Sequence, residues 1–125
     1  MIANTPSITV IGFGEAGASL CIGWKRAGVR SFDIKQTQPQ TQAAMLAAMH
    51  KLGVESAADA ASAVSDADLI FSTVTADQAF DAASSVAPGL KPGAFFFDLN
   101  SCAPTTKQKS AAVIEAAGGR YVDIA

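Results

Sequence analysis

A glycine-rich turn close to the start of the chain constrains the fold more than any other feature. The apolar, β-branched run at residues 7–11 leads directly into the pattern Gly12-x-Gly14-x-x-Gly17. Such a run predicts a short buried strand, and residues 16–27 are typical of a helix. A strand, three spaced glycines and a helix in this order predict the opening of a nucleotide-binding α/β domain.

Each glycine has a mechanical role in this predicted turn. Gly12 permits the sharp turn off the strand, Gly14 lets a pyrophosphate approach the backbone without an intervening Cβ atom, and Gly17 lets the helix lie close to the strand. The start of the helix offers unpaired N–H groups and the positive end of its dipole. The turn therefore predicts a phosphate-binding site.

An acidic residue follows the glycine turn at the sequence spacing that is typical of a ribose-binding carboxylate. Asp33 follows Gly12 by 21 residues and lies near the end of a second predicted strand, residues 29–34. Its carboxylate would accept hydrogen bonds from both ribose hydroxyls and repel a 2′-phosphate, which favours NAD over NADP. Lys35 would favour the phosphate, but it lacks the planar fork of arginine. The alternative is a glycine-rich turn with a surface aspartate and no ligand.

The composition restricts the class of protein. Residues 1–125 have room for one domain, and a hydrophobic fraction of 50% with 16% charged residues suits a sheet covered on both faces. The net charge of −2 provides no basic surface for a nucleic acid. No apolar run is long enough for a membrane span, and residues 1–6 do not resemble a signal peptide, so we expect a cytoplasmic protein.

Cysteine and histidine usage gives no sign of a disulfide framework or a metal centre. Cys21 and Cys102 are the only cysteines and lie far apart in the sequence. His50 is the only histidine and has no cluster of ligand residues around it, so we expect it on the surface of a helix. The sequence therefore predicts no metal site.

Alternating strands and helices extend over the rest of the chain. The predicted strands are residues 7–11, 29–34, 54–55, 68–74, 94–99 and 120–124. The predicted helices are residues 16–27, 41–52, a segment from a Ser56-x-x-Asp59 capping box to about Ser65, a segment from a Thr75-x-x-Gln78 capping box to about Ala87, and 105–117. Residues 35–42 are predicted to form a polar loop. This alternation predicts a doubly wound, six-stranded parallel sheet of the Rossmann type with strand order 3-2-1-4-5-6.

Ligands of such sheets bind at the carboxyl ends of the strands. The predicted site is therefore formed by residues 12–17, 33–35, 74–77 and 100–102. These loops contain no Ser-His-Asp or Cys-His set. Lys107 and Lys109 lie beyond them on the last helix, where we expect solvated side chains. We accordingly predict no catalytic residue in this chain.

Three motifs resemble the amino-terminal domain of the β-hydroxyacid dehydrogenases, a family that includes 6-phosphogluconate and 3-hydroxyisobutyrate dehydrogenases. Residues 11–17 resemble the family's opening glycine turn. Residues 98–104, Asp-Leu-Asn-Ser-Cys-Ala-Pro, resemble its Asp-x-Ser-Thr-x-x-Pro substrate loop, and residues 121–125 resemble the start of its Asp-Ala-Pro-Val-Ser-Gly-Gly segment. Asn100 replaces the usual serine and Ser101 the usual threonine; the likeness is greatest to the phosphogluconate-dehydrogenase-like branch.

The resemblance implies a role for each matching residue. Gly12, Phe13, Gly14 and Glu15 would line the pyrophosphate turn, Asp33 would bind the adenosine ribose, and Val74 and Thr75 would flank the nicotinamide ribose. Asn100 and Ser101 would approach the nicotinamide and the substrate, with Cys102 beside them in the same loop.

The resemblance also implies partners and a wider context for the domain. The cofactor would be NAD or NADP, the substrate a small hydroxy acid, and the assembly a homo-oligomer. The family's catalytic lysine belongs to a helical domain that this sequence does not contain, so we expect no turnover by this chain alone. Two alternatives stay open: a non-catalytic dinucleotide-binding module, and a domain of the related imine reductases.

Overall fold

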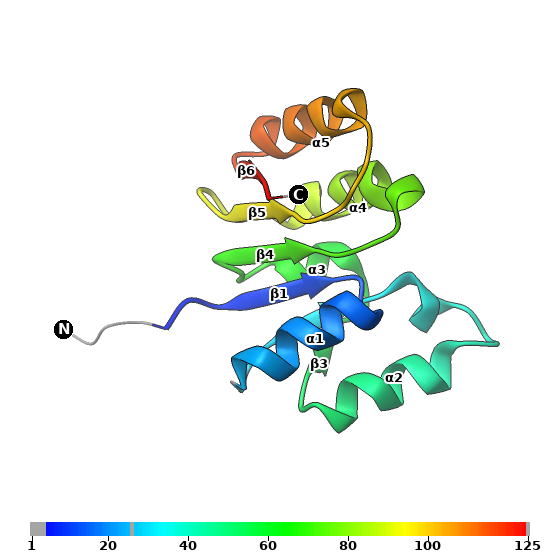
Figure 1. The fold of residues 1–125 in the computed structure, drawn as a ribbon. Coiled ribbons are helices and arrows are strands. Elements are labelled where there is room, and N and C mark those ends of the chain that lie inside the picture. The colour runs from blue at the N-terminus through cyan, green and yellow to red at the C-terminus, as the bar shows by residue number, and fades with distance from the viewer. Residues whose placement is uncertain (1–4, 26, 125) are drawn as a thin grey trace.

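The computed structural model describes residues 5–25 and 27–124, and its centre is a parallel β-sheet (Figure 1). Among these residues the sheet has six strands in the order β3-β2-β1-β4-β5-β6, and every pair of neighbours is parallel. The strands are β1 (Ile8–Ile11), β2 (Arg30–Phe32), β3 (Glu55–Ser56), β4 (Leu69–Ser72), β5 (Phe95–Asp98) and β6 (Arg120–Asp123). The predicted doubly wound order is confirmed.

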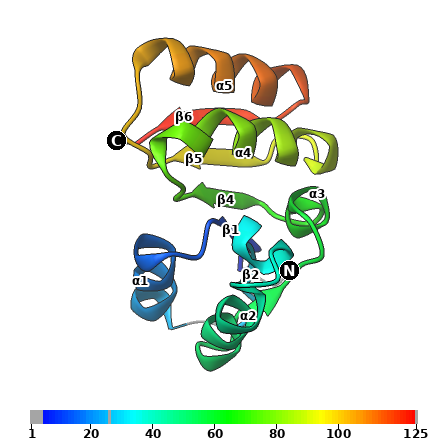
Figure 2. The same ribbon diagram turned by 90° about the vertical axis from the view of Figure 1, so that its right-hand side faces the viewer.

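Helices cover both faces of the sheet, and Figure 2 shows α1 and α3 on opposite sides of it. The α-helices are α1 (Glu15–Trp24), α2 (Gln42–Lys51), α3 (Ala60–Val64), α4 (Ala79–Val86) and α5 (Pro104–Ala116). Short 3₁₀ turns are η1 (Ile34–Thr37), η2 (Ala76–Gln78) and η3 (Ala87–Gly89). Helices α1 and α2 pack on one face of the sheet, over the half that contains β1 and β2. Helices α3, α4 and α5 pack on the other face. No helix in the described part of the chain is both long and apolar enough to cross a membrane.

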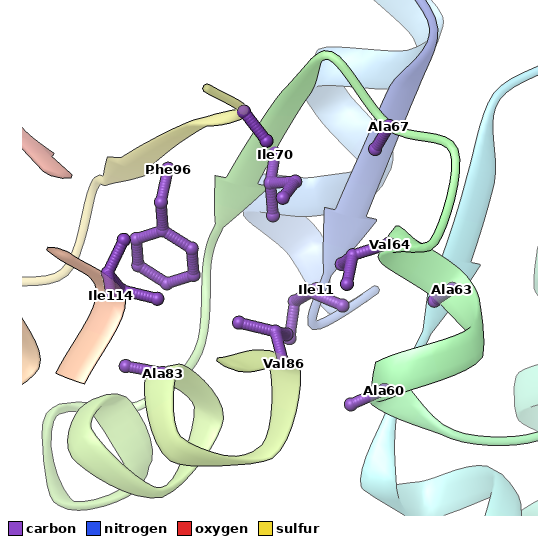
Figure 3. Close-up of a cluster of buried hydrophobic side chains, with 11 residues drawn as sticks. Ile11, Ala60, Ala63, Val64, Ala67, Ile70, Ala83, Val86, Phe96 and Ile114 are labelled. Carbon is purple, nitrogen blue, oxygen red and sulfur yellow. The ribbon is translucent and has the colours of Figure 1, made fainter. Parts of the chain in front are cut away.

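Two apolar clusters, one on each face, follow from the alternation of side chains along the strands. Ile70 and Phe96 point toward α3, α4 and α5, and Figure 3 shows the Phe96 ring beside Ile114 of α5. On the other face, Val10 is fully buried and packs with Met49 of α2. Because β1 is buried along its whole length, the end of β1 has a fixed position in the domain.

Helix α1 ends earlier than the sequence indicates. The prediction extended the helix to residue 27 with Gly28 as its stop, but α1 ends at Trp24. Lys25 adopts a left-handed conformation with φ of 49°, and its N–H donates to the Cys21 carbonyl. A left-handed residue ends a helix in this way, although glycine is the more usual choice. Gly28, with φ of 82°, instead forms part of the turn into β2.

Both predicted capping boxes are wrong in detail. Asp59, not Ser56, is the N-cap of α3: its carboxylate accepts from the Ser62 N–H at 2.8 Å, and the Ser62 hydroxyl accepts from the Asp59 N–H at 3.3 Å. Thr75 makes no side-chain cap, since the 3₁₀ turn η2 separates it from α4. The chain therefore leaves the end of β4 in a tight turn before α4 begins.

Candidate functional site

The glycine turn is held in place by contacts that leave no room for side chains at two of its positions. Gly12 has φ of 90°, and a Cβ atom there would lie 2.4 Å from the Thr73 carbonyl oxygen. A Cβ atom on Gly17 would lie 2.2 Å from the Gly12 carbonyl oxygen. The Gly12 N–H donates to the Phe32 carbonyl at 2.9 Å, and the Thr73 hydroxyl donates to the Gly12 carbonyl at 2.8 Å. The turn is thus fixed against β2 and the end of β4.

Gly14 differs from these two glycines because it adjoins empty space. A Cβ atom on Gly14 would have no atom within 4 Å. Gly14 is also the N-cap of α1, and no side chain caps this helix. The N–H groups of the first turn therefore meet an open volume that carries the positive end of the helix dipole. This arrangement fits an anionic group such as a pyrophosphate.

Asp33 connects the end of β2 to the glycine turn. Its Oδ2 atom accepts from the Phe13 N–H at 2.7 Å, and its Oδ1 atom accepts from the Lys35 N–H at 2.8 Å. Gln36 completes a capping box by accepting from the Asp33 N–H at 3.1 Å. Each carboxylate oxygen keeps a further lone pair that can accept a hydroxyl. Asp33 can therefore both hold the turn and bind a ribose.

These elements enclose a cleft of about 350 Å³ at the carboxyl ends of β1, β2 and β4. The cleft brings together seven of the residues predicted for cofactor binding: Gly12, Gly14, Glu15, Asp33, Lys35, Val74 and Thr75. Three others, Phe13, Gly17 and Asn100, do not line it. Phe13 is buried in the core with 3% of its surface exposed and offers only its backbone, while Gly17 is buried under the turn.

A second, wider pocket of about 890 Å³ lies beside the cleft. Asn100, Ser101 and Cys102 line it from the loop after β5. Ala76 lines the same pocket and is the immediate neighbour of Thr75, which lines the cleft. The residues predicted for substrate binding are therefore close to one another, and they adjoin the cleft where η2 begins.

A network of charged and hydrogen-bonded groups around the buried Asp98 lies beside this second pocket. Asp98 has 1% of its surface exposed and accepts from the Tyr121 hydroxyl at 2.5 Å and from the Asn100 N–H at 2.9 Å. The Lys107 Nζ atom lies 3.7 Å from Asp98 Oδ1 and 2.6 Å from Asp123 Oδ1. The network thus joins β5, β6 and α5 where the loop after β5 begins.

Lys107 contradicts the prediction of a solvated lysine. Only 11% of its side chain is exposed. Burial by itself would lower the pKa of Lys107, but the hydrogen bond to Asp123 and the attraction of Asp98 and Asp123 raise it above its ordinary value. A lysine held in the charged form cannot serve as a base near neutral pH. Lys109 is exposed, as predicted, with its ammonium 5.0 Å from the centre of the Phe80 ring.

We expect the tyrosine in this network to resist ionisation. Burial, followed by the hydrogen bond to Asp98, raises the pKa of Tyr121 above its ordinary value of 10.0. The stability that comes from the neutral phenol is therefore fully present below about pH 10 and is lost as the pH rises toward the folded-state pKa. Because the sequence contains one tyrosine, ultraviolet absorbance of the phenolate reports this residue alone. We predict no phenolate signal at about pH 11 while the protein is folded; ordinary titration around pH 10 would contradict the network.

Sequence reasoning missed two residues that support the site. Thr73 holds the Gly12 carbonyl and lines the cleft, and Gln36 holds the Asp33 backbone. Gln36 carried a readable signal, because an aspartate followed three residues later by glutamine is a capping-box pattern. Thr73 carried none, since its partner is 61 residues away in the sequence.

The comparison with protein families decides the assignment. Residues 7–125 match the family model described as the NAD binding domain of 6-phosphogluconate dehydrogenase. The chain belongs to this family. Among curated protein sequences none matches the chain.

Solved structures share the fold of this NAD-binding domain. A conserved hypothetical protein from Sinorhizobium meliloti 1021 is 33% identical with a TM-score of 0.87, over 97% of this chain and 41% of its own. The 3-hydroxyisobutyrate dehydrogenase of Mycobacterium tuberculosis is 24% identical with a TM-score of 0.77, over 96% of this chain and 40% of its own. An imine reductase from Myxococcus stipitatus in complex with NADP⁺ is 24% identical with a TM-score of 0.70, over 94% and 40%. The chain thus spans about two fifths of the length of these structures.

Proposed function

We propose that this domain holds a nicotinamide dinucleotide in the cleft for hydride transfer to or from a small hydroxy acid in the neighbouring pocket. The bound nicotinamide would supply the hydride chemistry. The chain's own residues would bind the pyrophosphate at the turn of residues 12–15, bind the adenosine ribose through Asp33, and position the substrate beside Ser101 and Cys102 in the loop after β5. The family match and the shared fold support this proposal.

One observation carries the proposal more than the others. The uncapped start of α1 faces empty space at Gly14. At Gly12 and Gly17, by contrast, a Cβ atom would collide with the backbone, so contacts within the protein already explain why these positions are glycine. A turn with only a structural purpose would need Gly12 and Gly17 but not Gly14. The third glycine therefore points to a ligand that comes close to the backbone at this position.

We propose that groups outside these 125 residues supply the proton transfer. The described residues that line the two pockets include no histidine, and Lys107 is engaged with two carboxylates. The test is a cofactor-reduction assay with a panel of small hydroxy acids, run beside a binding measurement with NADH fluorescence. We expect binding without turnover. Turnover that is lost in Lys107→Met would contradict the role given to this lysine.

We predict a preference for NAD over NADP of about tenfold, because the Asp33 carboxylate would repel a 2′-phosphate at close range in a surface-like dielectric. Lys35 is the opposing group, since its exposed side chain lines the same end of the cleft. Titration of both cofactors into the unmodified chain and into Lys35→Met measures the balance. We expect Lys35→Met to weaken NADP binding and to leave NAD binding within about twofold. Equal or tighter binding of NADP by the unmodified chain would show that Lys35 outweighs Asp33.

Homo-oligomer formation stays a prediction. Within the described residues β6 pairs only with β5, and Ile124 beyond it is 53% exposed. An open edge and an exposed apolar side chain favour association with another copy.

A further inference from the structure

We propose that Asn100 is a positioning residue. It acts on the dinucleotide through the backbone of residues 73–75, the β4–η2 connection, rather than by direct contact. This inference rests on the proposed function, because it assigns the mechanism by which one end of the same cleft is kept in shape. It departs from the role that the family resemblance implies for Asn100, which is contact with the nicotinamide and the substrate.

The Asn100 side chain joins two loops that follow different strands. Its Oδ1 atom accepts from the Val74 N–H at 2.8 Å, and its Nδ2 atom donates to the Ser72 hydroxyl at 3.1 Å. The orientation of the amide follows from chemistry, since the Val74 N–H is a donor and must meet the oxygen. The side chain therefore fastens the end of β4 to the loop after β5.

The backbone of Asn100 is also held by a hydrogen bond. Its N–H donates to Asp98 Oδ1 at 2.9 Å, and Asp98 is in turn held by the Tyr121 hydroxyl. The chain of hydrogen bonds thus runs from β6 through β5 to the end of β4. A network of hydrogen bonds between buried polar groups holds them in a rigid arrangement.

Burial separates Asn100 from the cleft. Only 4% of its surface is exposed, and that surface belongs to the second pocket, whereas Val74 and Thr75 line the cleft itself. Both polar atoms of its side chain already have a protein partner. Asn100 therefore sets where the Val74–Thr75 backbone lies, and these two residues line the cleft next to the glycine turn.

Because of the position of Asn100, its replacement should weaken binding of the nicotinamide half of the cofactor and not of the adenosine half. The adenosine end of the cleft is formed by Asp33 and Lys35, far along the sheet from β5 in the strand order. Loosening the β4–η2 connection should weaken binding of whole NAD⁺ and spare a ligand that fills only the adenosine and pyrophosphate subsites. ADP is such a ligand.

The experiment measures NAD⁺ and ADP affinities by calorimetry for the unmodified chain and three variants. Asn100→Leu keeps the branching of the side chain and removes both side-chain hydrogen bonds. Ser72→Ala removes one partner of Asn100 from a position that is fully buried in β4 and touches no pocket. Gln108→Ala is the matched control, because this exposed residue lines the same pocket as Asn100 without bonding to it.

We expect Asn100→Leu to weaken NAD⁺ binding about tenfold and to leave ADP binding within about twofold. Ser72→Ala should show the same pattern with a smaller loss, and it decides the question alone if Asn100→Leu does not fold. Gln108→Ala should change neither affinity. Equal losses for both ligands, or unchanged NAD⁺ affinity, would overturn the proposal. A loss in Asn100→Leu with full affinity in Ser72→Ala would indicate direct contact and also overturn it. If the unmodified chain binds neither ligand, the proposed function itself fails.

Discussion

Replacement of Gly14 by valine is expected to abolish dinucleotide binding while the domain stays folded. The backbone at Gly14 has φ of −78° and ψ of −156°, an extended conformation that other residues can adopt, and the added side chain would enter open space. That same space is the volume in which a pyrophosphate would meet the N–H groups of α1. The expected loss of affinity is about a hundredfold or more, since the ligand would lose its contacts with the helix start.

Calorimetry with NAD⁺ and thermal unfolding followed by circular dichroism measure the two halves of this prediction. Gly23→Val is the matched control, because a Cβ atom on Gly23 also meets open space but Gly23 lies in the last turn of α1 and does not line the cleft. The control should bind NAD⁺ with unchanged affinity. Retained affinity in Gly14→Val would show that the ligand does not bind at this turn.

Replacement of Gly17 by alanine should have the opposite signature, a loss of stability. The new methyl group would lie 2.2 Å from the Gly12 carbonyl oxygen and 3.0 Å from the Thr73 hydroxyl. Backbone cannot move aside as a flexible side chain can, so α1 would have to shift away from β1. Overpacking of this kind costs about 2–4 kcal/mol in the free energy of unfolding.

Urea denaturation measures this cost, with Gly23→Ala as the control on the same helix. A Cβ atom on Gly23 meets no atom within 4 Å, so alanine there should raise the free energy of unfolding by about 0.5–1 kcal/mol. The two variants make the same chemical change with opposite expected signs. If Gly17→Ala were as stable as the unmodified chain, this result would contradict the close packing of α1 on the turn.

The fold could be predicted from the sequence because its signals are local and mutually consistent. Apolar runs at β1, β4 and β5 have the continuous character of buried parallel strands, and the glycine pattern specifies how the first strand joins the first helix. The carboxyl ends of parallel strands lie at one edge of a sheet. The position of Asp33 beside the glycine turn followed from that rule and from sequence spacing.

The polar network beside the second pocket could not be predicted in the same way. Lys107 looks like a solvated helix residue until the register of β5 and β6 places Asp98 opposite Asp123. Two carboxylates in that register need a cation between them, and α5 supplies it. The family resemblance implies a ligand contact for Asn100, and nothing in the sequence points to its protein partners, because the Val74 N–H and the Ser72 hydroxyl are 26 and 28 residues away. Long-range pairing of this kind leaves no local pattern.

Amide chemical shifts of the isotopically labelled protein during a titration with NAD⁺ test the central claim most directly. A chain of 12.7 kDa gives well-separated amide signals, and each signal reports one backbone position. We expect the largest shift changes in the segments 12–15, 33–35 and 74–75, which line the cleft. Absence of saturable changes, or changes confined to the opposite edge of the sheet around Gly28 and Glu55, would contradict the central claim.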